Sequence, residues 1–192
     1  MKTRVRLERP SARWLATFLV AVRRSRKLHA PWVSPPSTAT AFRAYLRRLR
    51  RPTHVGHLVC MRGSGELVGV VNISEIVHGA FRSGYLGYYA FRPHEHQGFM
   101  TEGLALVLDD AFRRLRLHRL EANVQPGNEA SRRLVQRLGF RHEGYSARYL
   151  KIRGRWRDHE RWAILADARF QGGGAVACAR SRRALAIAAR RC

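Results

Sequence analysis

The chain has 192 residues, and its 37 lysines and arginines exceed its 13 acidic residues to give a net charge of +24 at pH 7. A hydrophobic content of 45% excludes a disordered chain and allows one domain with a buried core. So large a positive charge would suit nucleic acid or an anionic surface. The arginines are spread along the whole chain, however, which favours a general bias of composition.

Cysteine usage and one apolar run bear on the compartment. The three cysteines, at positions 60, 178 and 192, are too few and too irregular for a disulfide framework, so we expect a cytoplasmic protein. The apolar residues 14–22 follow basic residues, as in a signal peptide. Because Arg23 and Arg24 follow directly, with no small-residue cleavage site, and the run is too short to span a bilayer, we expect a core helix.

The first fifty residues predict a strand, a helix, a loop and a second helix. Residues 3–8 alternate apolar and polar side chains, as in a strand, and helical spacing after Pro10 predicts a helix to about position 25. Three prolines exclude a regular helix over residues 29–36, so we expect a loop there, lying over the acceptor cleft. Either Thr38 or Thr40 then caps a helix that ends near position 50.

Three strands and a helix follow. Residues 55–61 and 67–76 predict a hairpin across a glycine-containing turn, and residues 85–91 predict a strand rich in aromatic side chains. Pro93 ends this strand because it has no N–H group to donate to a ladder. After Gly98, apolar residues recur at three- and four-residue spacing, which predicts a helix with one buried face.

The loop over residues 94–98 opens into the N-terminus of this helix. The first helical N–H groups lack partners and the helix dipole favours negative charge, so the loop is a candidate anion site. An ordinary strand-to-helix connection would have the same pattern. The loop has neither the spaced glycines of a dinucleotide-binding loop nor the Gly-Lys-Ser/Thr of a Walker loop.

A similar unit of strand, turn and helix comes next. Leu120, Ala122 and Val124 alternate with polar residues, as in a half-buried strand. Asn128 stands where the N-cap of a helix belongs, and Gly139 follows the last helical residue as a C-terminal cap.

The remaining residues predict a closing hairpin and a tail. Residues 145–152 and 155–165 form the hairpin, so we expect one domain over residues 1–167. Residues 168–192 are rich in glycine, then in alanine and arginine, and predict a basic tail that is disordered or forms a short helix.

Two of these segments together resemble a known family. Gly-Phe-Met-Thr-Glu at 98–102, Asn-Glu-Ala-Ser at 128–131 and Leu-Gly-Phe at 138–140 resemble the cofactor segments of the GCN5-related N-acetyltransferases, the GNAT superfamily. The resemblance extends from about Arg4 to Ala166 and is strongest to the branch that acetylates the N-terminal alanine of ribosomal proteins. It implies an α/β (α+β) fold, with a twisted, mixed, mostly antiparallel sheet of about seven strands flanked by about four helices.

The resemblance also implies a chemistry, the direct transfer of an acetyl group from acetyl-coenzyme A to an amine. The loop N–H groups of residues 97–101 would hold the pyrophosphate, and the strand edge at residues 88–91 would pair with the pantetheine arm and stabilise the oxyanion. The cofactor contacts implied in this way are Tyr89, Ala90, Phe91, Gln97, Gly98, Phe99, Met100, Thr101, Asn128, Ser131 and Arg133.

Two residues are candidates for the proton transfers. Many family members carry a tyrosine where this chain has Val135, and in the ribosomal branch the serine that corresponds to Ser131 donates the proton to the leaving thiolate instead. A serine in the first turn of a helix is also common without such a role. For the base we choose Glu75, acting through a water, although an exposed carboxylate at the end of a strand would look the same. Tyr145 is the next candidate for the acid.

The chain departs from the family at two positions. The family usually has Gln or Arg where this chain has Glu95, and often has Gly where this chain has His96. A carboxylate beside the pyrophosphate would repel it unless the side chain turned outward, and His96 places a Cβ where the backbone approaches closely. Neither His94 with His96 nor His54 with His57 is completed by a carboxylate or thiol at zinc-site spacing, so we expect no metal.

The acceptor predicted by the resemblance is the N-terminal alanine of a ribosomal protein. One alternative is a small amine, such as an aminoglycoside or a polyamine, which an acidic acceptor cleft would favour. Another is a non-catalytic module that binds RNA or the ribosome on the same fold. We expect any RNA contact to be weak and no membrane partner, and the sequence leaves both a monomer and a dimer open.

Overall fold

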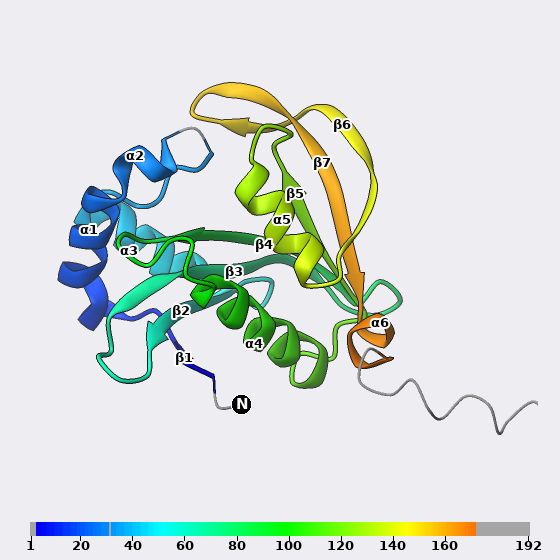
Figure 1. The fold of residues 1–192 in the computed structure, drawn as a ribbon, viewed down its shortest axis with the longest axis horizontal. Helices are drawn as coiled ribbons and strands as arrows, with labels where there is room; N and C mark the ends of the chain where they lie inside the picture. Colours follow the sequence, from blue (N-terminus) through cyan, green and yellow to red (C-terminus); the bar gives the residue numbers. More distant parts are fainter. Residues whose placement is uncertain (1–2, 31, 172–192) are drawn as a thin grey trace, which may run out of the picture.

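The computed structural model describes residues 3–30 and 32–171. Seven strands form one mixed sheet in the order β1-β2-β3-β4-β5-β7-β6, and helices cover both of its faces (Figure 1). The strands are β1 (Val5–Glu8), β2 (Val55–Met61), β3 (Leu67–Val77), β4 (Ser83–Ala90), β5 (Arg119–Val124), β6 (Arg141–Ile152) and β7 (Arg155–Leu165). The helices are η1 (Ala12–Trp14), α1 (Leu15–Arg24), α2 (Arg26–His29), α3 (Ala39–Arg48), α4 (Phe99–Arg113), α5 (Glu129–Arg137) and α6 (Ala166–Gln171). The predicted fold class is confirmed.

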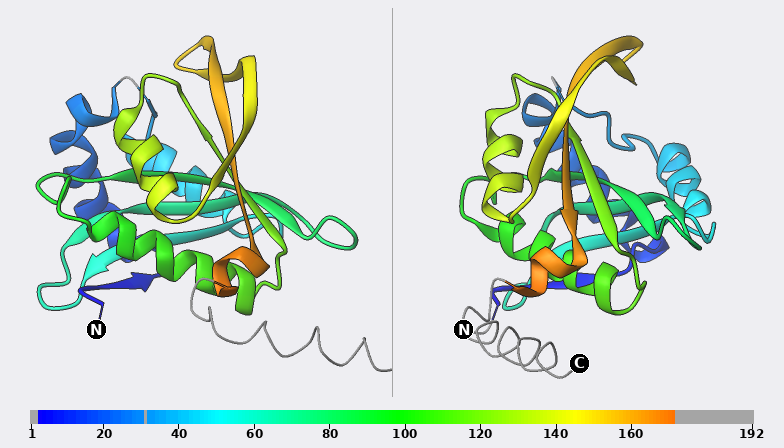
Figure 2. Two further views of the ribbon diagram at one scale, coloured as in Figure 1. Left: turned by 45° about the vertical axis from the view of Figure 1, so that its right-hand side comes forward. Right: turned by 90° about the vertical axis from the view of Figure 1, so that its right-hand side faces the viewer.

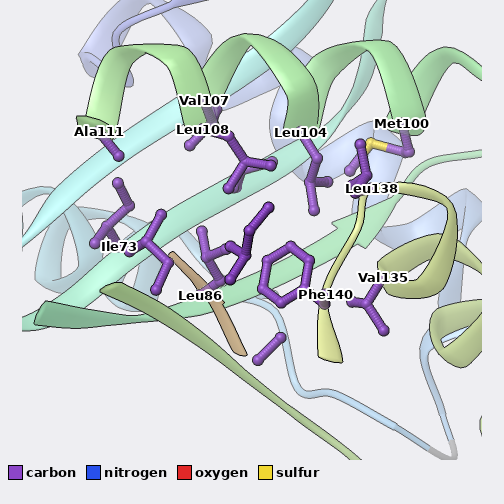
Figure 3. Close-up of a cluster of buried hydrophobic side chains, with 14 of the residues drawn as sticks. Ile73, Leu86, Met100, Leu104, Val107, Leu108, Ala111, Val135, Leu138 and Phe140 are labelled. Atoms are coloured by element: carbon purple, nitrogen blue, oxygen red, sulfur yellow. The ribbon is translucent and has the colours of Figure 1, made fainter. Parts of the chain in front are cut away.

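Alternation along the strands divides the core between the two faces of the sheet. On one face, α4 packs Leu104 and Leu108 against the sheet, with Phe140 beside them (Figure 3). On the other face, α1 and α3 contribute Phe18 and Phe42, whose ring centroids lie 4.6 Å apart. Strand β4 therefore lies between two apolar layers and contributes side chains to both.

Two predicted helix caps are confirmed. Thr38, rather than Thr40, caps α3, since its hydroxyl accepts a hydrogen bond of 3.1 Å from the N–H of Ala41. The side-chain oxygen of Asn128 accepts from the N–H of Ser131 at 3.1 Å and so fixes the start of α5.

The helix predicted from Pro10 to about position 25 is wrong at its start. A 3-10 turn, η1, precedes α1, and the side chain of Ser11 makes no capping hydrogen bond that would start an α-helix earlier. The expected domain boundary at residue 167 falls inside α6. Residues 172–192, which make up most of the predicted tail, lie outside the described residues. Among the helices of the described residues, none has the length and hydropathy needed to cross a membrane.

The centre of the sheet opens where β4 and β5 part. These two strands run parallel and pair only from Ser83–Arg119 to Leu86–Ala122. Past these pairs, β4 continues along β3 while β5 continues along β7. Figure 2 shows β5 and β7 rising away from β4. Past Leu86, the edge of β4 that faces away from β3 is therefore open, while pairing with β3 holds β4 in position.

Candidate active site

A cavity of about 890 Å³ lies where β4 and β5 part. Residues of α2, β3, β4, β5, α4, α5 and the β6–β7 hairpin line it, together with the loop before α4. A cavity of this size takes a small molecule or a cofactor arm. The open edge of β4 forms part of its wall.

The backbone of this edge is available to a ligand. The N–H of Phe91 donates to the carbonyl of Val68 on the β3 side at 2.7 Å. Backbone groups alternate in direction along a strand, so Tyr88 and Ala90 direct theirs to the side that β5 has left. The carbonyl of Ala90 agrees with this, since it lies 2.7 Å from Nε2 of His29 in α2.

The loop before α4 provides an anion site of backbone groups. Gly98 is the N-cap of α4 with a left-handed φ of 80°, and no side chain caps the first helical turn. The N–H groups of this turn therefore lack a side-chain acceptor, and the helix dipole favours an anion beside them.

Arg4, in the segment before β1, holds this loop from outside. Its guanidinium donates to Glu102 at 2.6 Å and to the carbonyl of Gln97 at 3.0 Å, and it lies 4.3 Å from the ring centroid of Phe99. Burial acts to raise the pKa of Glu102, but the hydrogen bonds from Arg4 outweigh it and lower that pKa. Glu102 thus orients the loop as a charged partner of Arg4.

The two departures from the family pattern have local explanations. Glu95 lines the cavity, but Nε of Arg92 lies 3.0 Å from one carboxylate oxygen and offsets its charge. The side chain is 19% exposed, so it does not turn out into solvent. His96 has a φ of 62°, a left-handed conformation that explains why glycine suits this position.

A pair of hydroxyl groups stands in the cavity wall. Tyr88 on β4 and Ser131 in the first turn of α5 bring their oxygens to 2.5 Å. Burial raises the pKa of Tyr88 to about 12, against a smaller opposing effect of the Ser131 hydrogen bond, so the phenol is protonated at neutral pH. The side chain of Tyr88 was not among the residues predicted from the sequence. Alternation along the strand, which turns Tyr88 to the opposite face from Tyr89, is the signal that could have found it.

Glu75 also lines the cavity, but from an irregular stretch of β3. The pairing of β3 with β4 shifts register between Ser74 and Val77, and Glu75 has a φ of 49°. Its side chain is 70% exposed, and Nε2 of His54 lies 3.8 Å from one carboxylate oxygen. Its carboxylate is thus largely in water.

The predicted contacts divide into those that line the cavity and those that do not. Lining it are Tyr89, Ala90, Gly98, Met100, Thr101, Asn128, Ser131 and Arg133. Phe91 is fully buried in the cluster under α1 and α3, and Gln97 donates its side-chain N–H to the carbonyl of Pro93. Phe99 is buried beneath Arg4. Tyr145 is 54% exposed, donates to Asp158 and does not line the cavity.

The segment predicted over the acceptor cleft contributes His29 and Trp32 to the lining. Tyr85 on β4, and Tyr149 and His159 on the closing hairpin, also line the cavity and were not found from the sequence. The tip of this hairpin reaches toward α2, where Arg153 donates to the carbonyl of Ala30 at 2.7 Å (Figure 1). Within residues 3–30 and 32–171, no three His, Cys, Asp or Glu side chains are placed to hold a metal ion together.

The sheet opens between two parallel central strands, and the opening holds a helix N-terminus without a side-chain cap and a part-buried hydroxyl pair. The chain belongs to the acetyltransferase (GNAT) domain family, which it matches over residues 4–141. It is an acetyltransferase of this family.

Three similar proteins illustrate the family. A probable N-acetyltransferase of Bacillus subtilis, YjcK, is 37% identical over 121 residues, which cover 63% of this chain and 67% of that protein. The ribosomal protein uS5-alanine N-acetyltransferase of Escherichia coli is 43% identical over 94 residues, which cover 49% of this chain and only 48% of the enzyme. The structure of Mycobacterium smegmatis RimJ in complex with CoA-disulfide has a TM-score of 0.78 and 32% identity, covering 85% of this chain and 82% of that one.

Proposed function

We propose that the protein transfers an acetyl group from acetyl-coenzyme A directly to the N-terminal α-amine of another protein, the N-terminal alanine of a ribosomal protein. The observation that carries this proposal is the hydroxyl pair of Tyr88 and Ser131, which stands where β4 and β5 part. A leaving thiolate needs a proton donor at the point where an extended acyl carrier ends, and the pair provides one.

The chain offers complementary groups along the whole length of such a carrier. The free N–H groups at the start of α4 suit a pyrophosphate, and Arg133 and Arg137 add positive charge to the same cavity. The backbone of Tyr88 and Ala90 suits the peptide-like pantetheine arm, which would pair with the open edge as an added strand. An N–H of the same edge would stabilise the oxyanion. The structure of Mycobacterium smegmatis RimJ in complex with CoA-disulfide supports coenzyme A as the carrier.

The two catalytic residues predicted from the sequence have roles in this proposal. Ser131 donates a proton together with Tyr88, whose burial keeps its phenol protonated. Glu75 is near enough to the cavity to act as a base through a water. Because the acetyl group passes directly to the amine in this proposal, neither Ser131 nor Glu75 becomes acetylated.

The cavity wall favours a peptide N-terminus over a polycation. Only two carboxylates, Glu75 and Glu95, line the cavity within the described residues, and Glu95 is paired with Arg92. A polyamine, with several ammonium groups, would need more negative charge nearby. The relative named for uS5-alanine acetylation supports the ribosomal acceptor, although the matched segment spans about half of that enzyme.

The decisive experiment compares acceptors with one purified protein. A peptide that begins with Ala, the same peptide with a blocked N-terminus, and spermidine are each incubated with acetyl-coenzyme A, and released thiol is measured. We expect activity with the free peptide alone, and mass spectrometry of ribosomal proteins should show one N-terminus unacetylated when the gene is deleted. Activity with spermidine but not with the peptide would instead establish the polyamine as the acceptor.

A non-catalytic RNA module makes a different prediction. Binding through phosphate contacts weakens steeply as salt rises, because each neutralised phosphate releases counterions. We expect RNA binding by this protein to be weak, sensitive to salt and indifferent to sequence. Tight, sequence-selective binding that survives high salt, without acetyl transfer, would contradict the enzyme proposal.

A further inference from the structure

The closing hairpin brings an imidazole into the cavity. His159 on β7 is a cavity-lining residue that is only 2% exposed. The ring of Tyr149, on the neighbouring strand β6, lies edge-on to it, with centroids 6.3 Å apart. The ring of His159 is therefore held in place by packing.

The hydrogen bonds of His159 select one tautomer. Its Nδ1 lies 2.9 Å from the carbonyl oxygen of Arg157, which can only accept, so Nδ1 carries the hydrogen. Nε2 then has a free lone pair. It makes no hydrogen bond within the described part of the chain and is not among the fully buried atoms.

The surroundings keep this imidazole neutral. Burial lowers the pKa of His159 below its ordinary value, and the hydrogen bond to Arg157 and the charge of Asp158 oppose this only in part. The other titratable side chains around the same cavity are Tyr85, Tyr88 and Tyr89 of β4, Glu75 of β3, His29 of α2, His94, Glu95 and His96 of the loop before α4, Arg133 and Arg137 of α5, and Tyr149 of β6. Of the two carboxylates among them, Glu95 is paired with Arg92, and the side chain of Glu75 is largely in water.

We propose that Nε2 of His159 is the general base that accepts a proton from the acceptor's α-ammonium group. This inference rests on the proposed function and names the residue that activates the acceptor. Cavity-lining His29 cannot replace it, since its Nε2 is hydrogen-bonded to Ala90 and its Nδ1 is sealed from solvent.

The proton transfers balance. His159 takes one proton from the ammonium, and the freed lone pair forms the C–N bond to the acetyl carbon. The C–S bond breaks and its electron pair leaves with sulfur. The pair of Tyr88 and Ser131 gives a proton to sulfur and regains one, through solvent, from the nitrogen as the amide forms. His159 then releases its proton to water, so one acetyl transfer yields one thiol and one free proton.

His159 has an advantage over Glu75 in this step. A base works best when its pKa is near the operating pH, and an imidazole is closer to it than a carboxylate exposed to water. Glu75 is the competing candidate, so the experiment includes both residues.

The test is the pH dependence of kcat/KM for an Ala-initiated peptide at saturating acetyl-coenzyme A. In the wild type we expect the rate to rise with pH through a group of pKa below 6.5 and to fall above about 8, as the α-ammonium loses its proton. His159→Gln should lower the rate at pH 7 by about 10²-fold or more. In this variant the acidic limb below pH 6.5 should be replaced by a rise through about pH 8, because only the free amine then reacts.

His142→Gln is the matched control, since His142 lies on β6 against Trp162 and does not line the cavity. It should keep the wild-type profile. If His159→Gln retains the acidic limb, or if Glu75→Gln removes it instead, His159 is not the base.

Separate readouts distinguish this failure from failure of the proposed function. Wild-type protein that neither gains thermal stability with acetyl-coenzyme A nor acetylates any amine would reject the proposed function itself. If His159→Gln does not fold, the pKa of His159 is measured by NMR in the wild type. A pKa that differs from that of the kinetic acidic limb would overturn the inference.

Discussion

The two sides of the cavity are built in different ways. The proposed cofactor side is built mainly from two short segments, residues 94–101 and 128–137, in which backbone N–H groups and a helix cap provide the chemistry. The acceptor side takes single residues from α2, β3, β4 and the β6–β7 hairpin, spread over more than a hundred positions of the chain. A site made of local backbone geometry leaves a motif in the sequence. A site made of separate side chains does not.

The two sides also differ in charge. Arg133 and Arg137 line the cofactor side, and Arg4 supports its loop. The acceptor side is aromatic and neutral apart from Glu75, with His29 and His159 both held at lowered pKa by burial. We infer that the cofactor side binds by charge, whereas the acceptor side selects by shape and proton transfer.

The largest expected effect is the loss of the hydroxyl pair. Tyr88→Phe and Ser131→Ala should each lower the single-turnover rate by about 10²-fold, because each removes part of one proton-donating unit, while acetyl-coenzyme A affinity changes little. The double variant should be about as slow as the slower single variant, since residues that act as a unit are not additive. Fully additive losses would show that the two hydroxyls act independently.

A change of backbone geometry should break the cofactor side alone. Gly98→Val places a branched side chain at a φ of 80°, with Arg4 only 3.3 Å from the new Cβ. The left-handed conformation costs about 1–2 kcal/mol for such a residue, so we expect acetyl-coenzyme A binding to weaken by about 5- to 30-fold. The ligand-induced rise in melting temperature measures it. Gly63→Val is the control, because nothing lies within 4 Å of its Cβ, and an equal loss there would contradict the loop assignment.

The buried histidines of the acceptor side should make stability depend on pH. The pKa values of His29 and His159 are lower in the folded than in the unfolded state, so below about pH 6.5 the unfolded chain binds protons that the folded protein does not. The free energy of unfolding should therefore fall as the pH falls from 7.5 to 5.5. Urea unfolding measures this, and a variant with both histidines replaced by glutamine should lose most of the slope. If the free energy of unfolding of this variant depends on pH as steeply as that of the wild type, groups other than these two histidines cause the dependence.

The smallest expected effect concerns the support of the loop. Arg4→Ala removes an ion pair and a contact to Gln97, but Arg4 is 53% exposed, and exposed pairs contribute about 0–1 kcal/mol. We expect acetyl-coenzyme A affinity to fall no more than ~5-fold, with an unchanged chemical rate. Exposed Arg62, which does not line the cavity, supplies the control Arg62→Ala. A larger effect on rate than on affinity would place Arg4 in the chemistry.

Local sequence patterns predict most of the helices and strands and the loop before α4. The alternation at Leu120, Ala122 and Val124, the cap at Asn128 and the glycine at 98 act over a few residues, so local rules predict them. The resemblance to the family rests on the same short segments, which explains why it located Ser131 and the start of α4.

The tertiary structure alone decided what meets across the cavity. Tyr88 and Ser131 are 43 positions apart, and their contact depends on β5 leaving β4 after Leu86. The lone pair of His159 is free because the Arg157 carbonyl fixes its tautomer, while burial lowers its pKa. Hydrogen-bond partners and burial are properties of folded neighbours, and no local pattern of residues contains them.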